Sequence, residues 1–412
     1  MVRFINKHLL ILKMTEKPEF HREKLDNGVT VIFEKRNSSV VAVASSVKFG
    51  AQFETKEIKG ISHFVEHLVF KGTKNRKVDE IPREIESKGG ILNAFTAEEI
   101  TCYWNKLPSK YFRLGADVNR DLVLNPLFDK EPLERERKVV LEEIKMYHDN
   151  PSTHVLEKIK EMLYESPFNM SIAGTSDSVS SLSRKKIVDL FNSIYSTNNM
   201  IFSVVGGTSW EDVLEEAKKF PKTIKQINPI SIVEKNGELI EKRKGIDQAH
   251  MILGFHTPRI IDKNRHAAEI LDNILGGGMS SRLFQEIREK RGLCYAVKSS
   301  LEQSKEYSYE IIYVGTVKEK IKEVKEIILK EVNKLKELKQ SDLDEVKERL
   351  IGLREISKEK CDSTMVDLLQ EEIGGNAENY YKYEEEIGKI KLEDIHEIIK
   401  LKGFSFVALV PN

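Results

Sequence analysis

The run HFVEH at residues 63–67 contains the residue types of a metal centre. It places His63 and His67 four positions apart. On a helix this spacing puts both imidazoles on one face, with Cβ atoms about 5–6 Å apart, so both can bind one ion. Glu66 stands one position before His67, where it can reach the same ion without ligating it. That placement suits a general base that takes a proton from metal-activated water.

A helix and a third ligand must complete this constellation. Ser62 is the expected N-cap and Gly72 the expected stop of the helix. The best region for the third ligand is 134–144, where Glu136 and Glu143 share one helical face with an apolar residue between them. The pattern therefore predicts that both carboxylates point inward. An apolar stripe supports the first helix: Ile61, Phe64, Val65, Leu68 and Val69.

Two imidazoles and one carboxylate leave a fourth coordination position open for water, whose pKa such a site lowers to about 7. Zinc is the ion that this donor set most commonly binds, and ligand type alone leaves cobalt and manganese open. The residues thus predict a zinc site that hydrolyses a carbonyl compound, with one Zn²⁺ per chain.

The sequence contains two copies of one unit. Residues 84–93 match residues 286–295 without a gap, 202 positions later. With a shift of one residue, the HFVEH run falls on His266–Ile270, which keeps the first His and the Glu and loses the second His. Because a metal site needs both imidazoles, we expect a metal only in the first copy.

The alternation of short apolar strands with longer helical patterns predicts an α+β fold. It consists of two homologous α/β domains from an internal duplication, each a mainly antiparallel sheet with helices packed on it. The expected zinc-binding catalytic domain is 14–220. Residues 221–244, rich in Lys, Pro, Asn and Glu, are the expected linker, and residues 245–412 are the degenerate repeat domain.

Composition excludes several classes of partner. Lys+Arg and Asp+Glu are equal at 66 each, so no net charge favours nucleic acid or an anionic membrane. Three distant cysteines, Cys102, Cys294 and Cys361, argue against a disulfide framework and favour a reducing cytoplasm. The apolar run in residues 1–13 is too short for a membrane span and lacks a cleavage site, so this segment is an alternative start or a tail.

The stretch 60–73, GISHFVEHLVFKGT, resembles the signature of the pitrilysin/insulinase family of zinc metallopeptidases, which includes insulin-degrading enzyme and the mitochondrial processing peptidase. The resemblance covers nearly the whole chain, including the duplication, and is greatest to the short members that are similar to the processing peptidase. It implies that Glu143 is the third zinc ligand. It also implies that Glu136 is the auxiliary acidic residue of the site.

The same resemblance implies how a peptide is held. Asn93, Ala94 and Phe95 match the edge strand to which the substrate backbone adds as an extra strand. Arg288 and Tyr295 match a pair that contacts the substrate near the scissile bond in the long members, where it comes from the last quarter of a double-length chain. This chain has half that length. A homodimer, or a heterodimer with a sister chain, is therefore expected to complete the site.

Three functions stay open at this point. The first is an endopeptidase that acts on short or unfolded peptides, the second a peptidase that trims leader peptides, and the third a non-catalytic partner subunit. The third predicts damage to the metal site, which is intact in the sequence. Several residues also have an ordinary structural explanation: a solvated charge for Glu136 and Arg288, a turn for Asn93, and a core position for Tyr295.

Overall fold

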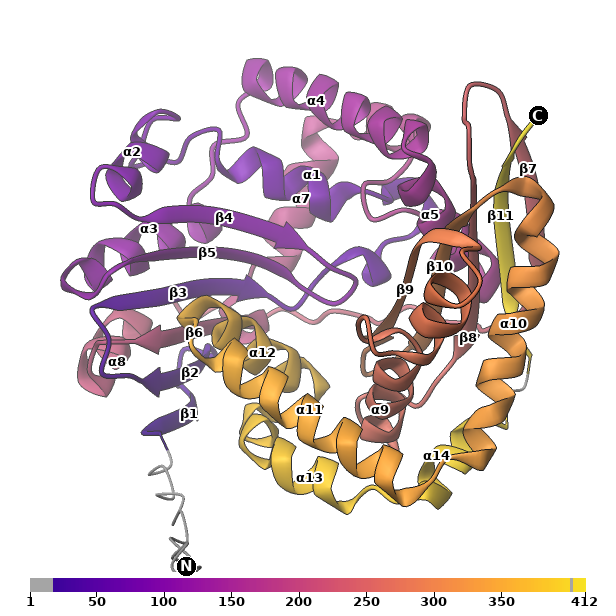
Figure 1. Cartoon of the computed structure of the whole chain (residues 1–412). Helices are drawn as coiled ribbons and strands as arrows, with labels where there is room; N and C mark the ends of the chain where they lie inside the picture. The colour runs from indigo at the N-terminus through magenta and orange to yellow at the C-terminus, as the bar shows by residue number, and fades with distance from the viewer. Residues whose placement is uncertain (1–17, 401–402) are drawn as a thin grey trace, which may run out of the picture.

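Each half of the chain folds around its own β-sheet (Figure 1). The computed structural model describes residues 18–400 and 403–412. In the first sheet only β2 and β6 run parallel, and all other neighbours are antiparallel. Its strands lie side by side in the order β1 (Phe20–Lys24), β2 (Thr30–Lys35), β6 (Met200–Gly206), β3 (Val40–Val47), β5 (Thr101–Pro108) and β4 (Ile91–Thr96).

The second sheet repeats this arrangement without a counterpart of β1. Its order is β7 (Glu238–Arg243), β11 (Ser405–Pro411), β8 (Ala249–His256), β10 (Ser308–Thr316) and β9 (Cys294–Gln303). Again only the first pair, β7 and β11, is parallel. Strand order and direction thus match between the halves. The predicted α+β class, with two related and mainly antiparallel units, is confirmed.

Strand β7 lies inside the stretch 221–244 that the sequence assigns to the linker. The second sheet therefore begins earlier than residue 245. Every second residue of β7 is exposed, because successive side chains of a strand point to opposite faces of the sheet and one face here meets solvent. Charged residues on this exposed face gave the segment the composition of a connection. The part of the stretch that precedes β7, residues 221–237, contains no helix and only an isolated bridge at Glu234.

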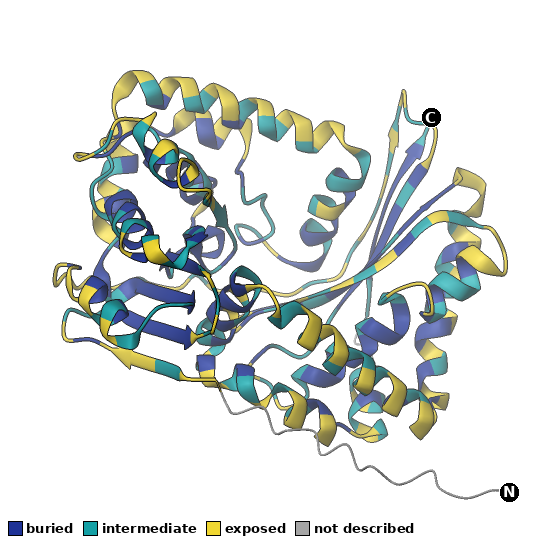
Figure 2. Ribbon diagram, turned by 60° about the vertical axis from the view of Figure 1, so that its left-hand side comes forward, coloured by how far each residue is buried: buried dark blue, intermediate teal, exposed yellow. Residues whose placement is uncertain are grey.

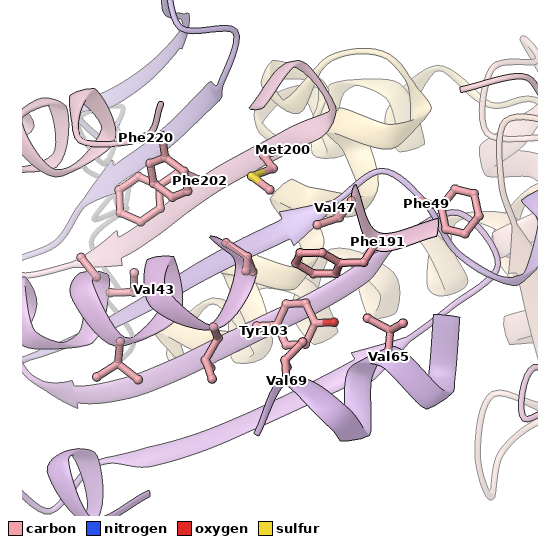
Figure 3. Close-up of a cluster of buried hydrophobic side chains, with 14 of the residues drawn as sticks. Val43, Val47, Phe49, Val65, Val69, Tyr103, Phe191, Met200, Phe202 and Phe220 are labelled. Carbon is pink, nitrogen blue, oxygen red and sulfur yellow. The ribbon is translucent and has the colours of Figure 1, made fainter. Parts of the chain in front are cut away.

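Two helices on one face of the first sheet carry the HFVEH run and Glu143. Helix α1 (Ile61–Val69) packs on β4 and β5, and α4 (Lys130–Asp149) packs on α1. In Figure 3, Val65 and Val69 of α1 face Tyr103 of β5 within the hydrophobic core. In the second half, α9 (Arg265–Gly276) packs on β9, and α11 (Gln340–Lys358) packs on α9.

The halves exchange one helix each. Helix α5 (Pro151–Leu163) follows α4 but packs on β8 and β11 of the second sheet. Helix α12 (Cys361–Gly374) follows α11 but packs on β3 and β6 of the first sheet, as Figure 1 shows. Each sheet is therefore covered by helices from both halves, which fixes the halves relative to each other.

The remaining helices share the hydrophobic cores of α1 in the first half and of α9 in the second half. Figure 2 shows their outward faces exposed and the central strands buried. Among the described residues, no helix is both long and apolar enough to cross a membrane. The remaining helices just described are α2 (Glu80–Glu86), α3 (Phe112–Leu124), α6 (Ser176–Ser181), α7 (Arg184–Ile194), α8 (Trp210–Lys218), α10 (Ile321–Lys334), α13 (Tyr383–Lys389) and α14 (Leu392–Ile398).

Candidate metal centre

A buried carboxylate caps helix α1, which carries HFVEH. The Glu54 side chain accepts hydrogen bonds from the backbone N–H of Gly60 (2.8 Å) and of Ser62 (2.7 Å). The prediction that Ser62 is the N-cap is wrong, since α1 begins after Gly60 and the Ser62 hydroxyl has no hydrogen-bond partner in the described chain. The fully buried Lys59 places its Nζ 3.9 Å from Glu54. A negative charge here is favoured by the helix dipole.

A close crossing of two backbone segments fixes the same end of α1. A Cβ atom on Gly60 would lie 2.5 Å from the carbonyl oxygen of Ala173, and one on Gly174 would lie 2.5 Å from that of Lys59. Both glycines also have positive φ angles. Only glycine fits at either position. The crossing holds the loop around Gly174 beside the metal-binding helix.

The structure brings His63, His67 and Glu143 together, with one ligand atom of each lying within 4.8 Å of the others. The Oε2 atom of Glu143 lies 3.5 Å from Nε2 of His67 and 3.7 Å from Nε2 of His63. This buried oxygen has no hydrogen-bond partner among the described residues. A buried acceptor without a partner is unfavourable unless another group, such as a cation, satisfies it. The donor set therefore fits a zinc ion.

Helix α4 supports two of these ligands. Glu136 lies on its inward face, where Oε2 is 3.2 Å from Nδ1 of His67 and Oε1 is 2.8 Å from Nζ of Lys71. A carboxylate at Nδ1 fixes the tautomer that leaves Nε2 free for a metal. The hydroxyl of Tyr147 donates to Oε1 of Glu143, which leaves Oε2 for the ion. Three residues of one helix face thus shape the centre.

Burial sets the protonation of two groups in the centre. It lowers the pKa of His63 to about 4, with help from the neighbouring His67 and against the effect of Glu143. His63 is then neutral at ordinary pH, as a ligand must be. Burial also raises the pKa of Glu66, against a hydrogen bond from Thr96 (2.5 Å) and the charge of His67. A raised pKa brings Glu66 closer to the pH at which a general base is most effective.

Strand β4 lies at the open edge of the first sheet, next to the centre. The backbone N–H of Ala94 is held by Oδ1 of Asn93 at 2.8 Å rather than by a backbone carbonyl. It is therefore a donor that a further strand could use. Ala94 and Phe95 line the cavity at the metal centre, whereas Asn93 is exposed and does not.

A cavity of about 790 Å³ opens in front of the metal centre. Its walls are α1, β4, α4, α5 and the loop around Gly174, with Tyr309 from the second sheet. This volume lies within the range of about 300–1,000 Å³ that is usual for ligand sites. Among the described residues, Tyr309 is the one lining residue from the second half, and α5, a helix of the first half, packs on the second sheet, so the cavity lies where the two halves meet.

Arg288 and Tyr295 lie elsewhere in the chain. The Arg288 guanidinium lies over the ring of Phe284, with its central carbon 4.8 Å from the ring centroid. Tyr295, on β9, is about half exposed, and its hydroxyl lies 3.3 Å from that of Tyr313. Neither residue lines the cavity at the metal centre. One chain therefore does not bring this pair to the metal ligands.

The degenerate copy has a different arrangement. His266 is buried, and its Nδ1 lies 3.1 Å from Oε1 of Glu269, whose other oxygen, Oε2, accepts a hydrogen bond from Tyr383. Within the described residues, the one cluster of His, Cys, Asp or Glu with metal-site geometry is that of the first half. The histidine and glutamate retained in the second copy bond to each other.

Sequence reasoning missed three residues of the centre: Glu54, Thr96 and Tyr147. Tyr147 follows Glu143 by one helical turn, a spacing that could have indicated the contact. Thr96 follows Ala94 by two positions, so both face the same side of the strand. Glu54 gave no sequence signal, because the segment between it and α1 is irregular.

Comparison with known proteins identifies the family. The sequence model of the insulinase family (peptidase family M16) matches residues 29–176, and that of the peptidase M16 inactive domain matches residues 181–350. An uncharacterised zinc protease of Bacillus subtilis, YmxG, is 32% identical over 84% of this chain and 86% of its own. One from Rickettsia felis is also 32% identical, over 93% of this chain and 92% of its own.

Solved structures agree in fold. A protease from Helicobacter pylori superposes with a TM-score of 0.88 at 23% identity, covering 96% of this chain and all of the other. A peptidase M16 inactive domain from Pseudomonas fluorescens superposes with a TM-score of 0.86 at 18% identity, covering 96% and 98%. With an intact HFVEH run in the first repeat and relatives matched over most of their length, the chain belongs to the insulinase family, peptidase family M16.

Proposed function

We propose that this chain is a zinc-dependent endopeptidase that hydrolyses short or unfolded peptides. The observation that carries the proposal is the convergence of His63, His67 and Glu143 on one position, with a buried oxygen of Glu143 left unpaired in the described chain. Relatives that match most of this chain are described as zinc proteases, which supports the same assignment.

In this mechanism His63, His67 and Glu143 hold the ion, and Glu136 keeps His67 in the required tautomer. Zinc bound there would supply Lewis-acid activation of a water molecule and of the scissile carbonyl. Glu66 accepts the proton of the attacking water and delivers it to the leaving amine. Its buried position favours this exchange, because burial raises the pKa of the carboxyl group.

The substrate adds to the free edge of β4 in this proposal. The backbone of Ala94 would bind the peptide main chain, which would lie beside Phe95, and Asn93 would release the N–H of Ala94 to it. Main-chain pairing tolerates many side chains. It also requires an extended peptide, which explains the restriction to short or unfolded chains.

We also propose that a second chain completes the site. Arg288 and Tyr295 do not line the cavity of their own chain, so a homodimer or a sister chain would present them. Tyr295 is about half exposed and is available for such a contact. Its hydroxyl would donate to the developing oxyanion. A reducing cytoplasm, inferred from three cysteines that are free, belongs to the same proposal.

A random peptide library tests the proposed activity. The purified protein is incubated with the library, with and without a chelator, and the cleavage sites are read by mass spectrometry. Cleavage that stops on chelation and returns with zinc is the expected result. Cleavage unaffected by chelation would overturn the proposal. Cleavage confined to a few related sequences would favour trimming of leader peptides, and intact peptides in all samples would favour the non-catalytic subunit.

A further inference from the structure

The carboxylate of Glu66 is held by a single side chain. The Thr96 hydroxyl donates to its Oε2 at 2.5 Å, and this is the one hydrogen bond to that carboxylate in the described part of the chain. Thr96 is the last residue of β4, the strand on which the peptide is proposed to bind. The contact thus joins the proposed base directly to the proposed substrate strand.

We propose that Thr96 is a positioning residue that holds Glu66 in the orientation required for proton transfer; this inference rests on the proposed function. The terminal torsion of a glutamate is soft, so an unrestrained carboxylate samples many orientations. Threonine is stiff at χ1 because its Cβ is branched. Its backbone is also held, since Thr96 pairs with Thr101 of β5. A rigid donor of this kind restricts the carboxylate to one orientation.

The hydrogen bond from Thr96 to Glu66 belongs to a strong class. A hydroxyl that donates to an ionised carboxylate forms a charge-assisted hydrogen bond, with an expected length of about 2.5–2.7 Å. Both groups are partly buried at the cavity wall, where fewer water molecules can replace the threonine. Loss of the hydroxyl would therefore free the Glu66 side chain without removing it.

The second repeat contains a contact of the same type at a neighbouring position. Ser299 lies on β9, next to Lys298, which is 202 positions after Thr96, and donates from its hydroxyl to Asp272 of α9. The counterpart of Glu66 is Glu269, which bonds to His266 and Tyr383 instead. A strand-to-helix bond between a hydroxyl and a carboxylate thus occurs in both halves. Only in the first half is the acceptor the proposed base.

Three variants separate positioning from plain structural support. Thr96→Val keeps the shape of the side chain and removes the donor, Thr96→Ser keeps the donor, and Ser299→Ala removes a bond of the same type in the repeat without a metal site. For each variant, kcat, KM, zinc content and the melting temperature are measured. A crystal structure then shows the orientation of Glu66.

Thr96→Val is expected to lower kcat about 10- to 100-fold, because a misplaced catalytic group has an effect of that size. KM and zinc content stay within twofold of the wild type, and the crystal structure shows Glu66 rotated away from the metal ligands. Thr96→Ser keeps at least half of the wild-type kcat, and Ser299→Ala keeps all of it. If Thr96→Val does not fold, Thr96→Ala provides the same comparison with a smaller side chain.

Equal kcat for Thr96→Val and the wild type would overturn the inference. An equal loss in Thr96→Val and Thr96→Ser, or in Thr96→Val and Ser299→Ala, would also overturn it. Failure of the proposed function gives a different result. In that case the zinc-loaded wild type itself cleaves no peptide, whereas failure of this inference alone leaves the wild type active.

Discussion

Each ligand side chain has a second polar atom besides the one that faces the ion position, and the three side chains differ in what contacts this second atom. Glu136 faces Nδ1 of His67, and Tyr147 donates to the second oxygen of Glu143. Nδ1 of His63 is buried and has no partner among the described residues. Groups that orient metal ligands typically change metal affinity by about 10- to 100-fold when they are removed. The effects of Glu136 and Tyr147, both on α4, on zinc affinity can therefore be measured one at a time.

Tyr147→Phe is predicted to weaken zinc binding about tenfold, because Glu143 loses the donor that fixes its ligating oxygen. Competition with a fluorescent chelator measures the affinity. Tyr313→Phe, which removes a hydroxyl bonded to His250 in the second sheet, is the control and leaves the affinity unchanged. Unchanged affinity in Tyr147→Phe would show that Glu143 is oriented without it.

At the scale of elements, α1 depends on a capping group outside its own sequence. Glu54 and Lys59 are both fully buried and face each other at 3.9 Å. Breaking a buried pair leaves the other charge without compensation, which is strongly destabilising. The position of the metal-binding helix thus rests on a pair that no metal-site motif includes.

Glu54→Gln is predicted to lower the free energy of unfolding by about 3 kcal/mol, since Lys59 stays buried without its partner charge. Urea denaturation measures the change. The double variant Glu54→Gln, Lys59→Met removes the isolated charge and recovers part of the loss. A loss below about 0.5 kcal/mol in the single variant, the range of ordinary surface substitutions, would contradict the role of the pair.

We predict that the stability of the protein depends on pH, because a carboxyl group is buried in the core of the second repeat. Glu310 on β10 is fully buried, and neither carboxyl oxygen has a hydrogen-bond partner among the described residues. Burial, with the nearby acids Asp272 of α9 and Glu302 of β9, raises its pKa well above the usual range. The folded protein therefore keeps a proton that the unfolded chain releases above a pH of about 4.3.

Because folding takes up this proton, the contribution of Glu310 to stability is complete below that pH. It declines as the pH rises toward the folded pKa, by up to about 1.4 kcal/mol per pH unit. Glu310→Gln stays neutral and is predicted to remove this part of the slope. Denaturation of both proteins between pH 5 and pH 8 measures it. Parallel slopes for the variant and the wild type would mean that Glu310 does not hold the proton.

The elements that local patterns define could be predicted from the sequence. The apolar stripe of α1 and the inward face of α4 follow from helical spacing, which predicts the HFVEH helix and the inward pair Glu136 and Glu143. The resemblance to the family then selects Glu143 as the ligand. The sequence does not reveal strand β7, because an edge strand with charged residues on both faces lacks a continuous apolar pattern. The Glu54 cap was missed because tertiary structure, not periodicity, brings it to α1.

At the scale of the whole molecule, long-range packing set the limits of sequence prediction. The repeat indicated two related halves, and the matching strand orders confirm them. It gave no sign that α5 and α12 are exchanged, because each helix has an ordinary amphipathic or apolar pattern that fits either sheet. The exchange matters for function, since α5 forms one wall of the cavity at the metal centre.

The proposed assembly predicts complementation between inactive chains. Arg288→Ala and Glu66→Gln each inactivate a homodimer in which one chain supplies the metal centre and the other supplies Arg288. After subunit exchange, mixed dimers contain one complete site, so an equal mixture regains about a quarter of the wild-type activity. Peptide cleavage measures the recovery. No recovery while the subunits demonstrably exchange would exclude completion of the site by a second chain.

The central claim is that Glu66 is the base of a zinc site formed by His63, His67 and Glu143. The most direct test compares Glu66→Gln with the wild type at equal, measured zinc content, on one peptide that the wild type cleaves. The predicted result is full zinc occupancy, unchanged peptide binding, and a fall in kcat of at least about a hundredfold, the size expected for loss of a general base. Cleavage by zinc-loaded Glu66→Gln at the wild-type rate would contradict the mechanism.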